Sequence, residues 1–351
     1  MTGRLEEVLG VDVPIVLGPF GGLSSVELTA VVSNAGGLGS YGLYGYDTAR
    51  IRSAVDQLRA ATGRPFALNL WLATGDENKP RDCDLGSLVR PLVPLFSELG
   101  LEPPTSLPDR FLPDLNEQID AVIQARPRVL SFVYGVPAPH VIEEMHRIGA
   151  AVLGTATTVD EAVALAEGGV DAVIASGAEA AGHRVSFLLP PEDSVVGTIA
   201  LVPQVVDAVD VPVIAAGGIA DRRGVAAAFA LGAQGVQVGT AFLATRQSAA
   251  APTYRAWLRT APAHATILTR AMSGRLARGL PNLATRTIEA EGGIAPFPAQ
   301  NWLTGQFRAK AARVDRADLL SLWAGQAATL SQLDEADDVF RELAAGLPIG
   351  R

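Results

Sequence analysis

The sequence predicts an α/β protein of the (β/α)8 TIM-barrel type, with a smaller, mostly helical cap and C-terminal region. Eight short apolar runs recur along residues 1–251. Each run ends in glycine or a polar loop, and an amphipathic stretch follows it. Buried parallel strands joined by crossover helices produce this pattern.

The strands and helices are expected to alternate along the chain. We expect strands at Pro14–Leu17, Leu38–Tyr41, Phe66–Leu70, Val129–Val133, Ala151–Leu153, Ala172–Ala175, Val213–Ala216 and Val236–Val238. Helical patterns lie at Ser25–Ala35, Thr48–Thr62, Ala138–Ile148, Val159–Glu167, Ile199–Val209 and Arg223–Leu231. An open doubly wound sheet rarely needs eight units and places its ligand loop after the first strand, whereas the ligand signals here come late.

Two segments exceed the eight units. Residues 73–112 form an insertion after the third strand, and residues 252–351 form a helical region that we expect to pack on the barrel of residues 1–251. Because βα loops emerge at the C-terminal rim of a barrel, the insertion is expected to cover the active-site mouth. A solvent-exposed excursion without a role is the alternative.

Composition excludes several partners. The chain has 351 residues and a net charge of -9 without a basic stripe, so nucleic-acid binding is not expected. Cys83 is the only cysteine, which excludes an intrachain disulfide and a CxxC metal site and favours the reducing cytoplasm. The N-terminal residues show no export signal. The uncharged stretch from Gly224 to Thr245 contains glutamines and glycines, so it is interpreted as helix, turn and strand, not as a membrane span.

Two glycine-containing strand ends near the close of the barrel predict a phosphate site. VPVIAAGGIAD contains Gly217 and Gly218, and GAQGVQVGTAFL contains Gly239 and Thr240. Glycine lets backbone N–H groups approach an anion, the following helix starts add their dipoles, and barrel enzymes often bind phosphate after strands seven and eight. Tight strand-to-helix turns without a ligand are the alternative.

A second signal lies after the sixth expected strand. DAVIASGAEAAGHRVSFL places small residues before His183. Small residues let a flat ring pass close to the backbone, with the imidazole beside its face, and a flavin fits such a slot. A lone histidine is usually structural, but the position at the catalytic rim favours a functional role.

Other catalytic motifs are absent or misplaced. The literal GxGxxG at Gly37 to Gly42 falls on and directly after a strand, too far from the next helix start near Asp47 to hold a pyrophosphate, so packing of the second strand explains it better. There is no HExxH, GxSxG or paired-carboxylate pattern, and no metal site is expected. An organic cofactor would supply the chemistry.

These motifs together resemble the nitronate monooxygenase family, formerly called 2-nitropropane dioxygenases, whose members are FMN-dependent barrel enzymes. The resemblance covers nearly the whole chain. It rests on PIVLGPFGGLSS, ALNLW, SGAEAAGHR, PVIAAGGIADRRG, GAQGVQVGTAF, SGRLARGLPN and SLWAGQ.

The resemblance implies roles for particular residues. His183 matches the family's active-site histidine. The implied FMN-binding residues are Phe20, Asn69, Ser176, Ala181, Gly182, Gly217, Gly218, Gln237, Val238, Gly239 and Thr240, the last four at the phosphate end. Two positions depart from the family pattern: Ser176 stands where glutamine is common, and Ala181 stands where glycine is common. An alanine with a left-handed backbone would be strained.

The implied reaction is oxidation of alkyl nitronates, or of neutral nitroalkanes, by FMN and O2 to a carbonyl compound and nitrite. His183 would act as a cationic or hydrogen-bonding partner of the nitronate oxygens, which we slightly favour, or as a base. The alternatives are an FMN-dependent enoyl-acyl carrier protein reductase that consumes NADH or NADPH and, in another class, a non-catalytic flavin- or phosphate-binding protein. The natural substrate and the choice between monomer and homodimer stay open.

Overall fold

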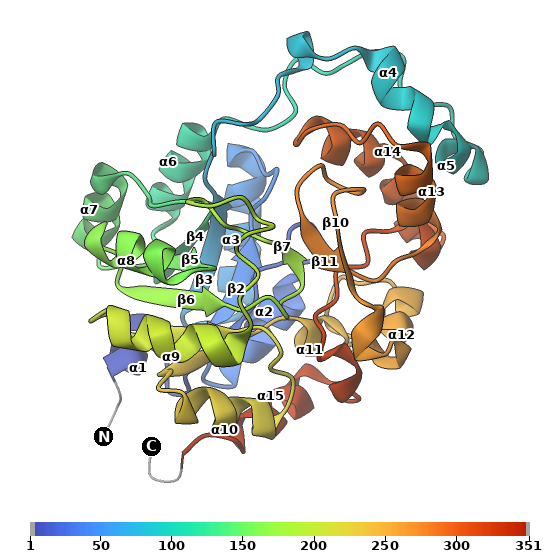
Figure 1. The fold of residues 1–351 in the computed structure, drawn as a ribbon. Coiled ribbons are helices and arrows are strands. Elements are labelled where there is room, and N and C mark those ends of the chain that lie inside the picture. Colours follow the sequence, from blue (N-terminus) through green and yellow to red (C-terminus); the bar gives the residue numbers. More distant parts are fainter. Residues whose placement is uncertain (1–3, 349–351) are drawn as a thin grey trace.

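The computed structural model describes residues 4–348, and eight parallel strands form its centre (Figure 1). The strands are β1 (Ile15–Leu17), β2 (Gly39–Gly42), β3 (Phe66–Trp71), β4 (Val129–Val133), β5 (Ala151–Ala156), β6 (Ala172–Ser176), β8 (Val213–Ala216) and β9 (Gly235–Val238). They are ordered β1-β9-β8-β6-β5-β4-β3-β2. A parallel bridge between Val16 and Leu38 brings β1 beside β2 and closes the barrel. The predicted TIM-barrel class is therefore confirmed.

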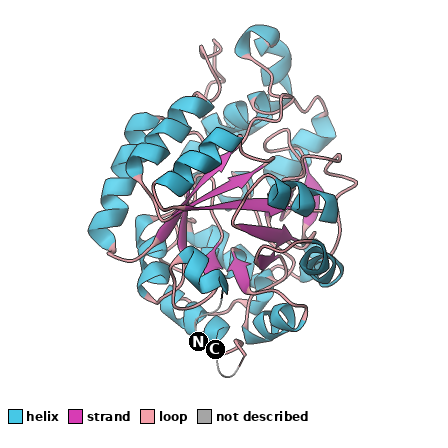
Figure 2. Ribbon diagram, turned by 90° about the vertical axis from the view of Figure 1, so that its left-hand side faces the viewer, coloured by secondary structure: helices cyan, strands magenta, loops and turns pink. Residues whose placement is uncertain are grey.

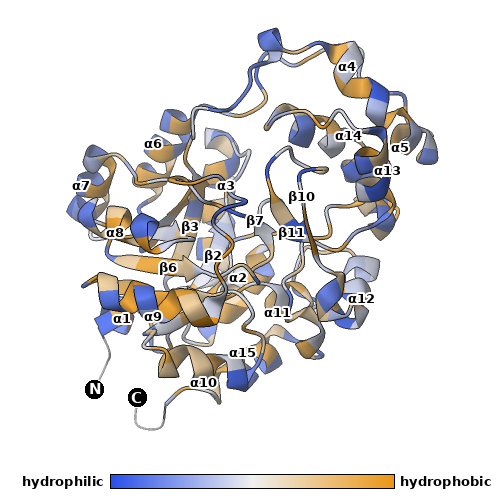
Figure 3. Ribbon diagram, viewed as in Figure 1, coloured by the Kyte–Doolittle hydropathy of each residue, from blue (hydrophilic) through white to orange (hydrophobic). Residues whose placement is uncertain are grey.

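Helices surround the strands, as Figure 2 shows. They are α2 (Val26–Asn34), α3 (Thr48–Ala61), α6 (Leu115–Ala125), α7 (Pro139–Arg147), α8 (Val159–Glu167), α9 (Thr198–Ala208) and α10 (Arg222–Ala230). Several of these helices carry both polar and apolar residues, which Figure 3 shows for α7 and α9. Their apolar sides and the outward strand residues form the larger core, so the strands are buried on both faces.

The inward strand residues form a second core, which α1 (Arg4–Leu9) closes at one end. Leu5 and Leu9 of this helix are fully buried against barrel residues such as Leu38 and Ile214. Side chains alternate between the two faces of a strand, so the residues two positions further along point into the same interior. The interior layer thus continues toward the C-terminal ends of the strands, where it becomes polar.

All eight expected strands are present, with ends shifted by at most a few residues. The expectations did not include a small antiparallel sheet in the order β10-β11-β7, formed by β10 (Ile267–Thr269), β11 (Ala277–Gly279) and β7 (Gly182–His183). Runs of two or three residues are too short to show a periodicity. The C-terminal region therefore contributes a strand that pairs with the segment containing His183.

The insertion after β3 packs against the C-terminal region. Its short helices α4 (Leu85–Val89) and α5 (Val93–Glu98) lie beside α13 (Leu283–Glu291) and α14 (Ala299–Arg313) (Figure 1). Phe96 and Phe307 meet edge to face in a shared core, with ring centroids 5.6 Å apart. This region also contains α12 (Pro252–Thr260).

The last helix, α15 (Ala336–Ala344), returns to the barrel between α2 and α10. Its Phe340 is buried in the larger barrel core. The covering helix of the eighth strand therefore comes from the end of the chain, because the helix that directly follows β9, α11 (Thr240–Leu243), is only 4 residues long. The division at residues 251 and 252 stays a prediction.

Two glycine-rich stretches take the structures expected from the sequence. A Cβ atom on Gly42 would lie 2.7 Å from the carbonyl oxygen of Phe20, so close packing of β2 explains the glycine at the end of GxGxxG. The stretch from Gly224 to Thr245 divides into most of α10, β9 and α11. Within residues 4–348, no helix has the length and apolarity needed to cross a bilayer.

Candidate active site

A cavity of about 410 Å³ lies at the C-terminal ends of the strands. Its lining includes these predicted site residues: Phe20, Asn69, Ser176, Ala181, Gly182, His183, Gly217, Gly218, Gln237, Gly239 and Thr240. The structure thus brings together residues from the first strand to the last. Their individual roles stay predictions.

Val238 is the predicted site residue that does not line this cavity. It follows Gln237 on β9, so strand alternation points its side chain to the opposite face. The side chain is 1% exposed in the core between strands and helices. Its backbone carbonyl accepts a hydrogen bond of 2.8 Å from the Gly18 N–H group, which positions the loop after β1.

The two glycine turns, called here the glycine cradle, are the predicted anion site. Gly217 and Gly218 have φ angles of 105° and 72°, a backbone region that glycine adopts without strain. Among residues 4–348, no group accepts a hydrogen bond from the N–H groups of Gly218 or Gly239. Gly239 is half-buried, Gly218 is exposed, and both line the cavity, so their N–H groups are free to bind an anion there.

The helix start after β8 is already occupied. The Asp221 carboxylate accepts hydrogen bonds from the N–H groups of Arg223 (2.9 Å) and Gly224 (3.4 Å), and it caps α10. This helix therefore has its first-turn donors filled by the protein. The expected contribution of its dipole to phosphate binding is weaker than the sequence suggested.

The two departures from the family pattern cause no strain. Ala181 is not among the residues with positive φ, whereas the next residue, Gly182, has a φ of 74°. The left-handed position of this loop is thus filled by glycine, and the methyl group of Ala181 is accommodated. Ser176 is 9% exposed at the end of β6, in the inward-facing layer that lines the cavity.

Asn69 is held at the cavity wall by its neighbour on β4. Its Nδ2 atom donates to the Ser131 hydroxyl (2.9 Å) and to the Ser131 carbonyl (3.2 Å). Because both amide protons are directed to β4, the side-chain oxygen of Asn69 is turned away from this strand. No group within residues 4–348 donates to that oxygen, so it is available to a ligand N–H group.

His183 is fixed on β7 between two indole rings. Its ring centroid lies 4.9 Å from that of Trp71 and 5.3 Å from that of Trp323. Its Nε2 atom lies 2.8 Å from the Ser273 hydroxyl, which in turn donates to the Arg275 carbonyl at 3.1 Å. With the hydroxyl proton used in this way, Nε2 carries the proton and donates to Ser273.

The imidazole is neutral at physiological pH. Burial, reinforced by the positive charges of Arg275 and Arg308, lowers the pKa of His183 from 6.5 to about 3. This finding argues against the expectation that His183 is a cationic partner of the substrate. Because the Nε2 proton is donated to Ser273, the remaining ring nitrogen, Nδ1, can only accept a hydrogen bond.

Arg308 on α14 lines the cavity, although no motif or spacing marks it as a site residue. Its guanidinium donates to the Asn301 side-chain oxygen (2.7 Å) and to the Ser321 hydroxyl (3.0 Å), and its Nε atom is shielded from solvent without an acceptor in the described part of the chain. Burial lowers the pKa of Arg308 to about 10, so it keeps its charge at neutral pH. Within residues 4–348 no carboxylate forms an ion pair with it.

Asn301 links Arg308 to a second donor at the cavity. An arginine can only donate, so the oxygen of the Asn301 amide faces Arg308 and the nitrogen faces Tyr44, with Nδ2 2.8 Å from the Tyr44 hydroxyl oxygen. Burial raises the pKa of Tyr44 to about 12, which keeps the hydroxyl protonated. Its proton is therefore available to an acceptor in the cavity.

Arg275 lies near His183 but its charge is compensated. The guanidinium binds Asp76 (2.6 Å) and Glu77 (2.7 Å) of the insertion, and it lies over the Phe297 ring with 4.0 Å from Cζ to the ring centroid. These contacts join the insertion to the C-terminal region. The uncompensated positive charge near the imidazole is consequently that of Arg308.

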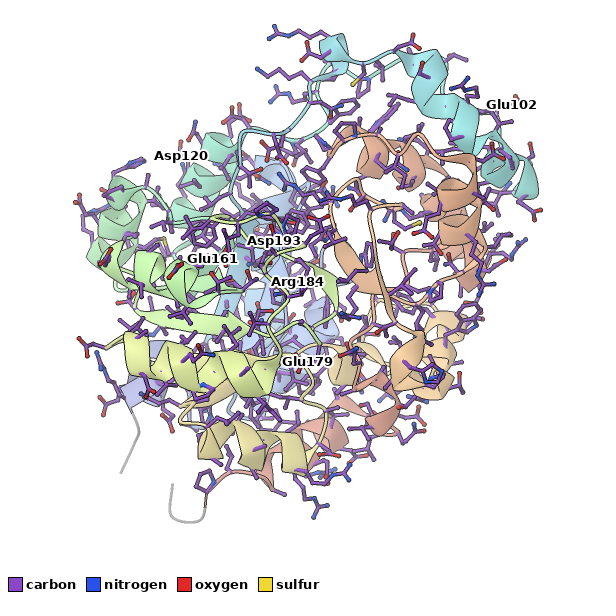
Figure 4. The ribbon with its side chains drawn as sticks, viewed as in Figure 1. Glu102, Asp120, Glu161, Glu179, Arg184 and Asp193 are labelled. Atoms are coloured by element: carbon purple, nitrogen blue, oxygen red, sulfur yellow. The ribbon has the colours of Figure 1, made fainter. Side chains whose placement is uncertain are left out.

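Three charged residues shape the loop that carries His183 (Figure 4). The fully buried Glu161 accepts hydrogen bonds from the N–H groups of Thr157 and Phe187, both at 2.6 Å. Arg184 donates to the carbonyls of Gly177 and Ser194, both at 2.8 Å. These bonds tie both ends of the loop between β6 and α9.

Glu179 connects this loop to the glycine cradle. Its carboxylate accepts from the Thr198 N–H group (2.9 Å) and hydroxyl (2.8 Å), and the same hydroxyl lies 3.0 Å from the Gly217 carbonyl. The Glu179 carbonyl accepts from the Gln326 backbone N–H group at 3.0 Å, and a Cβ atom on Gly325 would lie 3.0 Å from the same oxygen, which explains the glycine in SLWAGQ. The glycine cradle and the loop that carries His183 are thus joined by hydrogen bonds.

The fold and the site define a TIM-barrel oxidoreductase with a glycine cradle beside an aromatic pocket that contains Arg308. The family model described as nitronate monooxygenase matches residues 3–346. The chain therefore belongs to the nitronate monooxygenase family, which is generally flavin-dependent.

Similar proteins agree with this membership. The chain is 37% identical over 347 residues to a probable nitronate monooxygenase of Staphylococcus aureus strain JH9, covering 97% of this chain and 96% of the relative. The solved structure of nitroalkane oxidase from Streptomyces ansochromogenes is 34% identical, with a TM-score of 0.85 and coverage of 98% of this chain and 97% of that chain. The structure of FabK from Thermotoga maritima is 28% identical, with a TM-score of 0.74 and coverage of 98% and 95%.

Proposed function

We propose that this enzyme oxidises alkyl nitronates with bound FMN and O2, releasing a carbonyl compound and nitrite. The observation that carries the proposal is the uncompensated guanidinium of Arg308, which lines the same cavity as the neutral His183 and the glycine cradle. A buried cation without a carboxylate partner is costly unless an anion binds beside it. A nitronate is an anion and would supply that charge.

The cavity fits FMN at two places. The unpartnered N–H groups of Gly218 and Gly239 suit the phosphate, and the small residues Ala181 and Gly182 leave room for the flat ring system. FMN would supply the redox chemistry. The residues that would hold the ring also include Asn69, whose side-chain oxygen can accept from a ring N–H group.

The protein groups would act on the substrate through charge and hydrogen bonds. Arg308 would attract the nitronate, and the Tyr44 hydroxyl would donate to one of its oxygens. His183 is neutral and donates its one ring proton to Ser273, so it would shape the pocket beside the nitronate and would not donate to the nitronate oxygens. A histidine with so low a pKa is a weak base, which favours nitronates over neutral nitroalkanes as substrates.

Oxygen consumption by the purified FMN-loaded protein tests the proposal. With the nitronate of nitroethane we expect O2 uptake and nitrite release without oxidation of NADH or NADPH. A parallel anaerobic assay would detect reduction of the flavin by either nicotinamide. Rapid reduction together with no response to the nitronate would contradict the proposal and favour an enoyl reductase.

A further inference from the structure

Trp71 is the last residue of β3 and lies at the rim of the barrel. Side chains two positions apart on a strand point to the same face, so Trp71 continues the inward row of Asn69 and lines the active-site cavity. The indole also lines a second cavity of about 560 Å³, which lies between the barrel and the insertion. Trp71 is therefore part of a partition between two spaces.

This partition consists of the three aromatic residues that line both cavities, Tyr44, Trp71 and Phe297, which are called here the aromatic wall. The ring centroids of Tyr44 and Trp71 are 4.4 Å apart, and that of Phe297 lies 6.0 Å from that of Trp71. Aromatic rings at these distances attract one another. The indole is at the centre of the wall, because it contacts both of the other rings.

Neighbouring residues hold the aromatic wall in place. The Cζ atom of Arg275 lies 4.0 Å from the centroid of the Phe297 ring and 4.4 Å from that of the Tyr134 ring. The Tyr134 ring packs in turn on Trp71, with 5.2 Å between centroids. The Asn78 N–H group donates to the Phe297 carbonyl at 3.2 Å. Because opening the wall would break these contacts, the two cavities stay separate.

The active-site cavity leaves little space for the substrate. Pockets of about 300–1,000 Å³ bury most of a drug-sized ligand, so FMN would take up most of the 410 Å³ in this cavity. The nitronate would lie in the remaining space beside His183, whose ring centroid is 4.9 Å from that of Trp71. A substrate beside the imidazole is therefore also beside the indole, which limits the length of its alkyl chain.

The space beyond the wall suits hydrocarbon. The apolar residues of the second cavity are Leu43, Leu70, Leu72, Phe111, Leu112 and Leu115. Apolar side chains around a concave space favour an apolar ligand, because its binding removes hydrocarbon surface from water. The remaining lining includes charged residues of both signs, such as Lys79 and Asp109. An alkyl chain would thus find a favourable environment there if the wall were open.

We propose that Trp71 is a specificity-determining residue, which restricts this enzyme to nitronates with short alkyl chains by closing the active-site cavity against the second cavity. The inference rests on the proposed function. Removal of the indole would join the two cavities, and a longer chain would then extend into the second one while its reacting carbon stays beside His183.

The test compares kcat/KM for the nitronates of nitroethane and nitrohexane on the FMN-loaded enzyme. For the wild type we expect a value at least about tenfold lower with nitrohexane nitronate, because the wall leaves no room for the chain. Trp71→Ala should raise the ratio of nitrohexane to nitroethane nitronate at least about tenfold, since each methylene that leaves water for an apolar space favours binding about fourfold. The ratio is the informative quantity, because loss of the contact between the indole and His183 lowers both rates.

Two other variants of the aromatic wall support this comparison. Trp71→Phe keeps an aromatic ring and should change the ratio less than Trp71→Ala. Phe297→Ala opens the same wall at a different residue and should also raise the ratio, so the test does not depend on the folding of one variant.

A substitution in the second cavity provides the matched control. Leu112→Trp enlarges a side chain of that lining without touching the wall, and by itself it should leave kcat/KM unchanged for both substrates. Combined with Trp71→Ala, it should reverse the gain for nitrohexane nitronate, because it fills space that the chain would enter.

Titration of the flavin absorbance with propionate and hexanoate gives a readout that does not require turnover. The wild type should bind hexanoate at least about tenfold more weakly than propionate, and Trp71→Ala should remove this difference.

The inference is overturned if the wild type oxidises both nitronates with similar kcat/KM, if Trp71→Ala and Phe297→Ala leave the ratio unchanged, or if Leu112→Trp does not reverse the gain. Failure of the wild type to oxidise nitroethane nitronate would instead refute the proposed function. The carboxylate titration would then still decide whether the aromatic wall limits chain length.

Discussion

Replacement of Arg308 by methionine tests the charge argument most directly. The guanidinium is the uncompensated cation near His183, and its Nε atom has no acceptor within residues 4–348. A hydrogen bond to a charged group contributes about 1.5–3 kcal/mol. At about 1.4 kcal/mol for each factor of ten, loss of this contact should lower kcat/KM for nitroethane nitronate about 10- to 150-fold.

The stability of this variant should change much less than its activity. Methionine removes the cost of burying an unpaired charge, but it leaves the Asn301 side-chain oxygen and the Ser321 hydroxyl without their donor. These effects oppose each other, so we expect the free energy of unfolding to change by no more than about 2 kcal/mol. Arg308→Lys keeps the charge and should recover part of the activity.

The assay combines initial rates of nitrite release with the flavin content of each variant. Nitrate, a planar anion that resembles the nitronate group, should inhibit the wild type competitively and inhibit Arg308→Met more weakly. The reasoning is refuted if Arg308→Met retains its flavin and has a kcat/KM within twofold of the wild type. It is equally refuted if stability collapses while activity per folded, flavin-loaded molecule is unchanged.

Four other predictions concern the glycine cradle and the loop that carries His183. His183→Asn should leave FMN bound while turnover falls at least about tenfold, because the phosphate is held elsewhere; loss of FMN with unchanged turnover per flavin would refute the assigned role. Since the pKa of His183 is lowered to about 3, the wild-type kcat/KM should show no step from this group between about pH 5 and 8, which a pH profile would check. Gly217→Ala places a methyl group on a residue with a φ of 105°, 3.0 Å from the Thr198 hydroxyl. The affinity for FMN, measured by fluorescence titration, should therefore fall about tenfold. The control variant Gly63→Ala adds a methyl group in open space and should leave the affinity unchanged. Ala181→Gly should lower the free energy of unfolding by about 0.5–1 kcal/mol in a denaturant titration without improving FMN affinity, because no left-handed strain is relieved.

The same histidine makes stability depend on pH. In the unfolded chain the imidazole takes up a proton below its usual pKa of 6.5, whereas in the folded protein it stays neutral down to about pH 3. The unfolded state therefore binds more protons in this interval, and stability should fall as the pH drops from about 6.5. His183→Asn should reduce this loss in urea titrations at pH values of about 7 and 5.

The predicted site residues illustrate how far local pattern reaches. The glycine turns after β8 and β9 and the small residues before His183 were identified because each lies at the end of an apolar run, and in a barrel all such ends meet at one rim. Val238 was included only through the family resemblance, and its side chain points to the opposite face of β9 from the cavity, because adjacent strand residues alternate.

The sequence by itself determined the barrel, its rim and the family, because strand periodicity, glycine turns and motifs are properties of short segments. Only the tertiary structure decided the charge of the site. Arg308 and Tyr44 come from elements far from His183 in the chain, and no spacing rule links them; their meeting depends on how α14 packs against the barrel. The neutral state of His183 arises in the same way, because its burial is created by packing between distant segments.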